Sequence, residues 1–277
     1  MLKKLLKYDF KAVFKYWWIA AISSVALALA GGWSISIYTS EKELPTILYV
    51  VATIVAVVAI MGVAAFSFIT LIFVYMRFYK NFFTDEGYLT FTLPVKRGEL
   101  LNSKLITGIV AGCLTGFVIL FDLFIALVVG IPDVIFDEWL WKEFWEEFVV
   151  EIINGAGLGY LLLYITEFLL LFLLLGVFST LFVFCCITVG SLITKKAKII
   201  TSIGIYYGAN SVFTVIIQMF WLFGFEAILE WIGQLNENQF APVFALLLLC
   251  GILFIGAFCT VLYSLQYWML DRKLNLS

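Results

Sequence analysis

Two carboxylates stand where a charge is costly. Asp122 and Glu167 both lie inside long apolar stretches of the chain. An ionisable group at membrane depth usually faces a water-filled cavity or a specific partner. One interpretation therefore places both side chains on a translocation path or in contact with a substrate. The other is structural, a pairing with hydroxyls or backbone groups, or exposure to outside water. We favour the structural interpretation for Asp122 and leave both open for Glu167.

Other residue types that carry chemistry are missing or badly placed for it. The chain has no histidine, which excludes HExxH-type metalloproteases and histidine proton relays, and it has no GxxxxGK[ST] phosphate loop. The glycines of the pattern Gly155-x-Gly157-x-Gly159 follow no strand and are better read as the start of a membrane helix. All five cysteines lie in apolar runs without a CxxC pattern. We predict no catalytic residue, no metal site and no cofactor bound by this chain.

The composition of the chain is typical of an integral membrane protein. Hydrophobic residues make up 64% of the sequence and charged residues 13%, whereas a soluble domain has about 25% charged residues. Apolar runs long enough to cross roughly 30 Å of hydrocarbon recur along the whole length. The sequence predicts an all-α integral membrane protein, a single domain over 1–277, with six transmembrane helices near residues 16–39, 46–76, 105–130, 155–193, 200–222 and 241–268.

The distribution of positive charge predicts the topology. Fifteen of the 17 Lys and Arg residues lie in segments 1–15, 77–104, 194–199 and 269–277, and the remaining segments hold only Lys42 and Lys142. Cytoplasmic segments favour Lys and Arg, so we expect a multi-pass protein of the cell membrane with both termini in the cytoplasm. The same rule makes 155–193 one long helix, because two spans would carry the lysines at 195, 196 and 198 outside.

The first fifteen residues have the pattern of an amphipathic helix. At 100° per residue their lysines share one third of the helix circumference, and apolar side chains cover the opposite side with Asp9 as an exception. Such a helix lies in the membrane interface with its lysines toward water and anionic headgroups. We predict an interfacial elbow helix over 1–15 with lipid contacts from Lys3, Lys4, Lys7, Lys11 and Lys15; a loose positive tail is the alternative.

The cytoplasmic segment 77–104 is too apolar for a disordered tether. Thr84 or Asp85 can cap a short helix, and the acids Asp85 and Glu86 suit its N-terminal dipole. Pro94 ends that helix and permits another to begin, which runs on into the third span. The short helix presents apolar and aromatic side chains that either pack on the protein's own helices or fill a groove on a cytoplasmic partner.

At this segment the chain resembles a known family. The string YKNFFTDEGYLTFTLPVKRGELLNSKL is similar to the first cytoplasmic loop of ABC-2-type transporter permeases common in Gram-positive bacteria. The elbow helix, the six spans and the short basic tail resemble the same family in layout. The resemblance implies a coupling helix, with Asp85, Glu86, Tyr88, Leu89, Phe91, Leu93 and Pro94 gripping a separate ATPase subunit. It also implies two ATPases, which bind the ATP and magnesium, and a second permease, either a copy or a paralogue.

Two outer segments have their own patterns. Residues 133–152, within the outer segment 131–154, predict an amphipathic surface helix whose acids face water or attract a cationic substrate such as a basic antimicrobial peptide. Residues 219–240 are too apolar for an ordinary loop. The resemblance implies that they dip into the membrane before the last span, with Glu226 and Glu230 lining the outer exit.

Glycines at helical spacing occur on two spans. Gly108, Gly112 and Gly116 form overlapping GxxxG patterns on the third, and Gly204 with Gly208 forms one on the fifth. Small residues at this spacing let membrane helices approach closely. We expect these glycines to serve packing within the chain rather than a dimer seam.

The resemblance implies the membrane subunit of an ATP-driven exporter of a lipid, peptide or drug-like substrate, and this is the hypothesis that we favour. One alternative is a secondary transporter driven by an ion gradient, with Glu167 as the coupling carboxylate. Another is a non-transporting scaffold or immunity protein. Membrane lipids are expected partners in each case, and nucleic acid is not.

Overall fold

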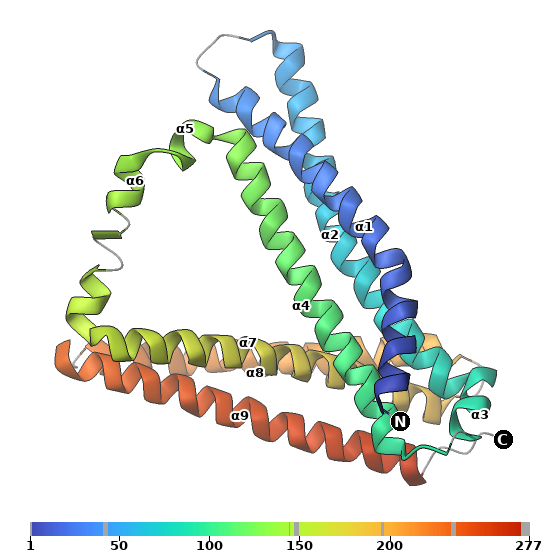
Figure 1. Ribbon diagram of the computed structural model, residues 1–277. Coiled ribbons are helices and arrows are strands. Elements are labelled where there is room, and N and C mark those ends of the chain that lie inside the picture. Colours follow the sequence, from blue (N-terminus) through green and yellow to red (C-terminus); the bar gives the residue numbers. More distant parts are fainter. Residues whose placement is uncertain are drawn as a thin grey trace. The chain divides into compact units, whose positions relative to one another are not determined.

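Every regular element in the described part of the computed structural model is a helix (Figure 1). The structure describes residues 2–40, 44–92, 94–143, 145–146, 150–194, 197–233 and 237–272. The long helices are α1 (Leu2–Thr39), α2 (Thr46–Phe83), α4 (Arg97–Gly130), α7 (Glu151–Ile193), α8 (Lys198–Gly233) and α9 (Glu237–Arg272). The short ones are α3 (Asp85–Thr92), α5 (Pro132–Ile135) and α6 (Glu138–Glu143).

The six predicted spans are confirmed as helices long and apolar enough to cross a membrane. Among the described residues these candidate spans are Leu2–Thr39, Thr46–Phe83, Arg97–Gly130, Gly157–Ile193, Lys198–Leu222 and Gln239–Arg272. The shortest of the long helices, α4, has 34 residues, which at 1.5 Å per residue is about 50 Å. Each long helix therefore exceeds the hydrocarbon layer of about 30 Å, and the chain fits a multi-pass membrane protein.

Two predicted boundaries differ in the structure. The expected break between the elbow helix 1–15 and the first span is missing, because α1 is one helix of 38 residues. No glycine or proline occurs before Gly31 to interrupt it. The described residues of 219–240 likewise contain no turn back into the membrane. Residues 219–233 are the last turns of α8, and α9 begins at Glu237.

The outer segment 131–154 is not the single helix that its pattern predicts. It contains the separate short helices α5 and α6, with Phe136 and Asp137 between them. The Asp137 carboxylate accepts a hydrogen bond of 2.9 Å from the Trp139 backbone N–H. Such side-chain bonds favour a helix start over a helix interior, so the acid divides the segment.

Helix α7 has one break. Gly157 has φ 81° and ψ 152°, and it is the one described residue with a positive φ. Glycine reaches this conformation without the Cβ clash that other residues suffer. The apolar span begins at this residue, as the prediction of a glycine-rich helix start requires.

Backbone contacts divide the chain into two units, which we describe separately. The first comprises Met1–Phe78 and Glu99–Trp145. Its centre is a buried cluster around Trp17, Ala21 and Phe66. The indole N–H of Trp17 donates to the hydroxyl of Thr115 at 2.9 Å, and that hydroxyl lies 3.2 Å from the hydroxyl of Thr70. This chain of polar contacts joins α1, α4 and α2 within the apolar part of the unit.

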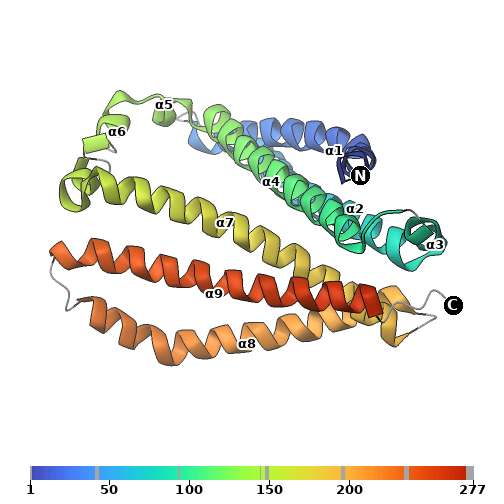
Figure 2. The ribbon, with the colours of Figure 1, turned by 60° about the horizontal axis from the view of Figure 1, so that its bottom comes forward.

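The second unit comprises Tyr79–Gly98 and Glu146–Ser277. Here α7 packs against both α8 and α9, and Figure 2 shows the three helices running alongside one another. Buried Gln266 of α9 donates to the Thr188 hydroxyl of α7 at 2.7 Å. The Tyr164 hydroxyl of α7 donates to the Ala241 carbonyl of α9 at 2.8 Å. These bonds fix α9 on α7 near both ends of the pair.

Close helix approach occurs at glycines outside the GxxxG patterns. A Cβ on Gly190 of α7 would lie 2.6 Å from the Cα of Ser202 on α8. A Cβ on Gly32 of α1 would lie 2.8 Å from the Ala126 carbonyl oxygen of α4. By contrast, no neighbouring atom of the described residues lies within 4 Å of the Cβ position at Gly112, Gly204 or Gly208. For these three glycines, the expectation of close packing within the chain is wrong.

The contrast between Gly190 and Gly204 gives a stability prediction. Gly190→Ala should lower the free energy of unfolding by about 1–3 kcal/mol, because the added methyl meets backbone that cannot move aside. Gly204→Ala should leave stability unchanged or raise it slightly, because alanine favours the helix. Thermal unfolding of the two variants in the same detergent measures the difference. Equal stability of both variants would contradict the described contact of α7 with α8.

Candidate functional site

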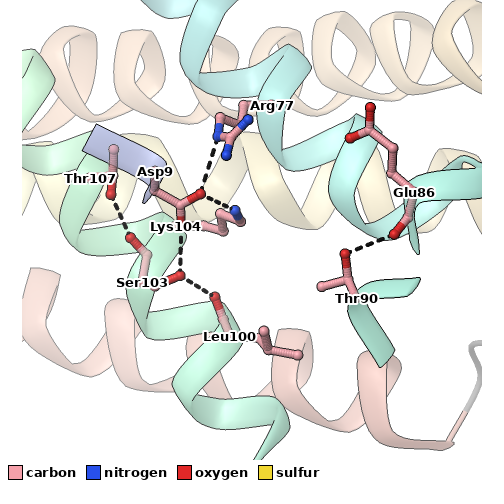
Figure 3. A network of polar contacts seen from close by, with 8 residues as sticks. All are labelled: Asp9, Arg77, Glu86, Thr90, Leu100, Ser103, Lys104 and Thr107. Carbon is pink, nitrogen blue, oxygen red and sulfur yellow. Dashed lines mark hydrogen bonds and ion pairs between the residues drawn. The ribbon is translucent and has the colours of Figure 1, made fainter. Parts of the chain in front are cut away.

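The first unit contains a buried charge cluster around Asp9 (Figure 3). Oδ1 of Asp9 accepts a hydrogen bond of 3.1 Å from Nε of Arg77 and another from Nζ of Lys104. Oδ2 accepts one of 2.8 Å from the Ser103 hydroxyl. The side chains of Asp9 and Lys104 are 4% and 7% exposed, and that of Arg77 is 30% exposed. One carboxylate therefore holds cations from two helices.

The position of Asp9 on α1 explains this burial. The lysines of the first turns are exposed on one side of the helix. Asp9 points the opposite way together with Val13 and Trp17, all of them buried. The side that packs against α2 and α4 thus carries one acid, and both neighbouring helices supply a cation. Removal of one partner from a buried pair costs about 3–5 kcal/mol, because the other charge is left uncompensated.

Helix α3, in the second unit, begins directly after α2 ends. The backbone N–H of Gly87 donates to the Thr84 carbonyl at 2.8 Å, and the Thr84 hydroxyl donates to the Lys80 backbone carbonyl at 2.6 Å. Gly87 is buried, and a Cβ there would lie 2.9 Å from the Phe82 carbonyl oxygen. The tight junction between α2 and α3 therefore requires glycine at this position.

The far end of α3 is anchored through Arg97. Its guanidinium lies over the Phe91 ring at 5.7 Å, and Nη1 donates to the Leu270 carbonyl at 2.7 Å. The same nitrogen is 3.3 Å from the Asp271 carboxylate. Carbonyls in the last turn of a helix lack partners within the helix, so Arg97 caps the end of α9. The residues after α3 are thereby attached to the end of α9.

The near end of α3 is anchored through Lys198. Its Nζ donates to the Phe83 carbonyl, the last residue of α2, at 3.0 Å. Lys198 is also the first residue of α8. A cation at the C-terminal end of α2 bonds to a carbonyl of the last helical turn and matches the helix dipole. Within the second unit, α3 is thus connected to α8 at its start and to α9 at its end.

The predicted coupling residues have different surroundings. Asp85, Glu86 and Pro94 are exposed. Phe91 packs edge-on against Phe82 with ring centroids 5.6 Å apart, so this side chain follows the prediction of packing on the protein's own helices. Leu93 lies outside the described residues, as do the side chains of Tyr88 and Leu89. A short helix between the second and third spans is confirmed, and its contact with an ATPase stays a prediction.

The substrate-path candidates belong to different units, Asp122 to the first and the three glutamates to the second. Asp122 of α4 is 1% exposed, and neither carboxylate oxygen has a hydrogen-bond partner among the described residues. The neighbouring hydroxyl is that of Ser24, which donates to the Ala21 carbonyl at 2.9 Å. One oxygen of Glu167 on α7 is buried without a hydrogen-bond partner in the described part. Glu230 is exposed, and the side chain of Glu226 lies outside the described residues.

The structural interpretation of Asp122 stays a prediction: the Ser24 hydroxyl lies beside the carboxylate, and among the described residues neither carboxylate oxygen has a hydrogen bond of standard geometry. The predicted lipid-facing lysines, Lys3, Lys4, Lys7, Lys11 and Lys15, are all exposed, as lipid contact requires.

The residues that sequence reasoning missed are Asp9, Arg97 and Lys198. For Asp9 a signal existed, since it is the one acid on the apolar side of a lysine-rich helix.

Comparison of the chain with family models, with curated proteins and with solved structures finds no match. The resemblance of residues 79–105 to a permease loop therefore stays a hypothesis based on those residues.

Asp122 and Asp9 form a matched pair for mutation. Asp122→Asn should leave the free energy of unfolding unchanged to within about 1 kcal/mol, because among the described residues the acid has no ion-pair partner and only the Ser24 hydroxyl beside it, which can also bond to an amide. Asp9→Asn makes the same chemical change at a fully paired acid and should cost about 3 kcal/mol or more. Unfolding of both variants in one detergent makes the comparison, and an equal loss in both would show that Asp122 has a stabilising partner.

Proposed function

We propose that the chain is the membrane-spanning permease subunit of an ATP-driven exporter. A separate ATPase supplies the energy, and α3 transmits it to the membrane helices. The observation that carries the proposal is the set of contacts at the two ends of α3. Lys198 of α8 bonds to Phe83 just before α3, and Arg97 just after α3 bonds to the end of α9.

These anchors give α3 the properties that a transmission element needs. Its acidic first turn is exposed, so a partner can reach it. Covalent continuity joins it to α2 and α4, and two cations join the adjoining ends of α2 and α4 to α8 and α9. A displacement of these eight residues therefore pulls on the ends of four long helices. A loose surface loop of equal length would absorb the same displacement without moving any of them.

The proposed orientation places both termini and α3 in the cytoplasm. The charge distribution supports it, because the segments rich in Lys and Arg include the start of α1 and the residues around α3. In this orientation Asp85 and Glu86 face a cytoplasmic ATPase, two copies of which would serve a pair of permeases. The substrate class is a lipid, a peptide or a drug-like molecule.

A second candidate function is ion-coupled secondary transport. The buried and unpaired carboxylate oxygens of Asp122 and Glu167 favour it, because buried acids in membrane proteins commonly exchange protons or bind cations. Energy source separates the two functions. Transport that persists after ATP depletion and stops when the ion gradient is collapsed would favour the secondary transporter.

Charge reversal at the start of α3 tests the proposal. The purified chain should hydrolyse no ATP, and an ATPase co-expressed with it should co-purify and be active. Asp85→Lys with Glu86→Lys should reduce co-purification at least tenfold, because both side chains are exposed where the partner must dock. The amount of ATPase retained by tagged permease in membrane extracts is the measurement.

The matched control is Asp133→Lys with Glu138→Lys, an equal charge reversal in an outer segment, which should leave co-purification unchanged. Membrane insertion of each variant is checked by its yield in the membrane fraction. Full retention of the ATPase by the α3 variant would refute the docking role of this helix.

A further inference from the structure

We infer that Asp9 is a positioning residue that makes the first turns of α1 move together with the two helices that flank α3. Only the purpose of this joint movement, the transmission of energy from an ATPase, rests on the proposed function. The connection itself follows from the contacts of one buried carboxylate with Arg77 and Lys104.

The two cations stand near the ends of α2 and α4 that lead to α3. Arg77 is on α2, which continues without a break to Phe83. Lys104 is on α4, which begins at Arg97. No other described helix contributes a charged group to this carboxylate. Asp9 therefore connects α1 to both flanks of the segment that carries α3, through one side chain.

The two connections differ in the exposure of the cation and in the support that its helix gives. Arg77 reaches Oδ1 with Nε from a side chain that is 30% exposed. Lys104 reaches the same oxygen from a side chain that is 7% exposed, and its neighbour Ser103 occupies Oδ2 at 2.8 Å. Loss of Arg77 removes one of three bonds and keeps a paired carboxylate. Loss of Asp9 removes the anion that both cations share and loosens the first turns of α1 from both helices, while the contacts around Trp17 further along α1 remain.

This difference makes the inference testable by distance. Spin labels on unnatural amino acids would replace exposed residues, Lys7 on α1 with either Met76 on α2 or Ile106 on α4. Pulsed electron resonance then measures the spread of each distance. Asp9→Asn should broaden both distributions at least twofold. Arg77→Gln should broaden the pair from Lys7 to Met76 and leave the pair from Lys7 to Ile106 unchanged.

Three further variants separate positioning from general damage. Asp9→Glu keeps the charge and should keep both distributions narrow. Asp9→Lys combined with Lys104→Asp restores one anion between two cations and should recover most of the wild-type spread. Lys11→Asn changes an exposed charge two residues away and should have no effect. If Asp9→Asn does not fold, Arg77→Gln and the charge exchange decide the question.

A second measurement connects the inference with the proposed function. In the presence of the ATPase, Asp9→Asn should retain co-purification, because α3 is unaltered, and should lower the stimulated ATP hydrolysis at least fivefold. Failure of any ATPase to bind the wild-type chain would refute the proposed function and leave the distance result standing. Wild-type distance distributions in Asp9→Asn, or broadening of both distances in Arg77→Gln, would overturn the role of Asp9.

Discussion

The hydrocarbon core of a membrane contains no water, and every backbone amide of this chain must find its partner inside the protein. A helix satisfies that requirement within itself, which explains why the described chain is built from helices long enough to cross the bilayer. The same constraint makes each buried charge expensive. Where the chain buries one, as at Asp9, the structure surrounds it with two cations and a hydroxyl.

The polar contacts of the second unit follow the same logic at the ends of helices. Carbonyls in a last helical turn have no partner in their own helix. At Phe83 and Leu270 those partners are Lys198 and Arg97, which belong to other elements. Caps of this kind satisfy the backbone and join neighbouring elements with the same bond. The contacts that finish α2 and α9 are therefore also the contacts that hold α3.

Hydropathy and charge were sufficient to predict the coarse architecture. The six spans follow from the length of the apolar runs, and α3 follows from the acids after Thr84 and from Pro94. The continuity of α1 was missed because the pattern of charged residues predicts which part of a helix lies at the membrane interface, and it does not predict where the helix breaks. The Asp9 cluster was out of reach for a related reason. Its cations are 68 and 95 positions away along the chain, and helical periodicity describes neighbours within a few turns only.

The Arg97 cap joins residues 173 positions apart. Its acceptors are backbone carbonyls, which every residue type has, so the amino-acid sequence does not identify them. The close approach at Gly190 was missed for the opposite reason. GxxxG patterns occur elsewhere, and three of their glycines, Gly112, Gly204 and Gly208, have no described neighbour within 4 Å of the Cβ position. Sequence thus indicated where charge was unusual, as at Asp122 and Glu167, and could not indicate which charges would be paired.

A motor in the cytoplasm can reach α3 only if this helix faces the cytoplasm, and labelling of introduced cysteines measures directly which side of the membrane it faces. Lys96 follows α3 and Lys142 lies in α6, and both side chains are exposed. Intact cells carrying Lys142→Cys should react with a membrane-impermeant maleimide, and cells carrying Lys96→Cys should react only after permeabilisation, each measured above the background of the wild-type cysteines. Reaction of Lys96→Cys in intact cells would place α3 outside and contradict its coupling to a cytoplasmic motor.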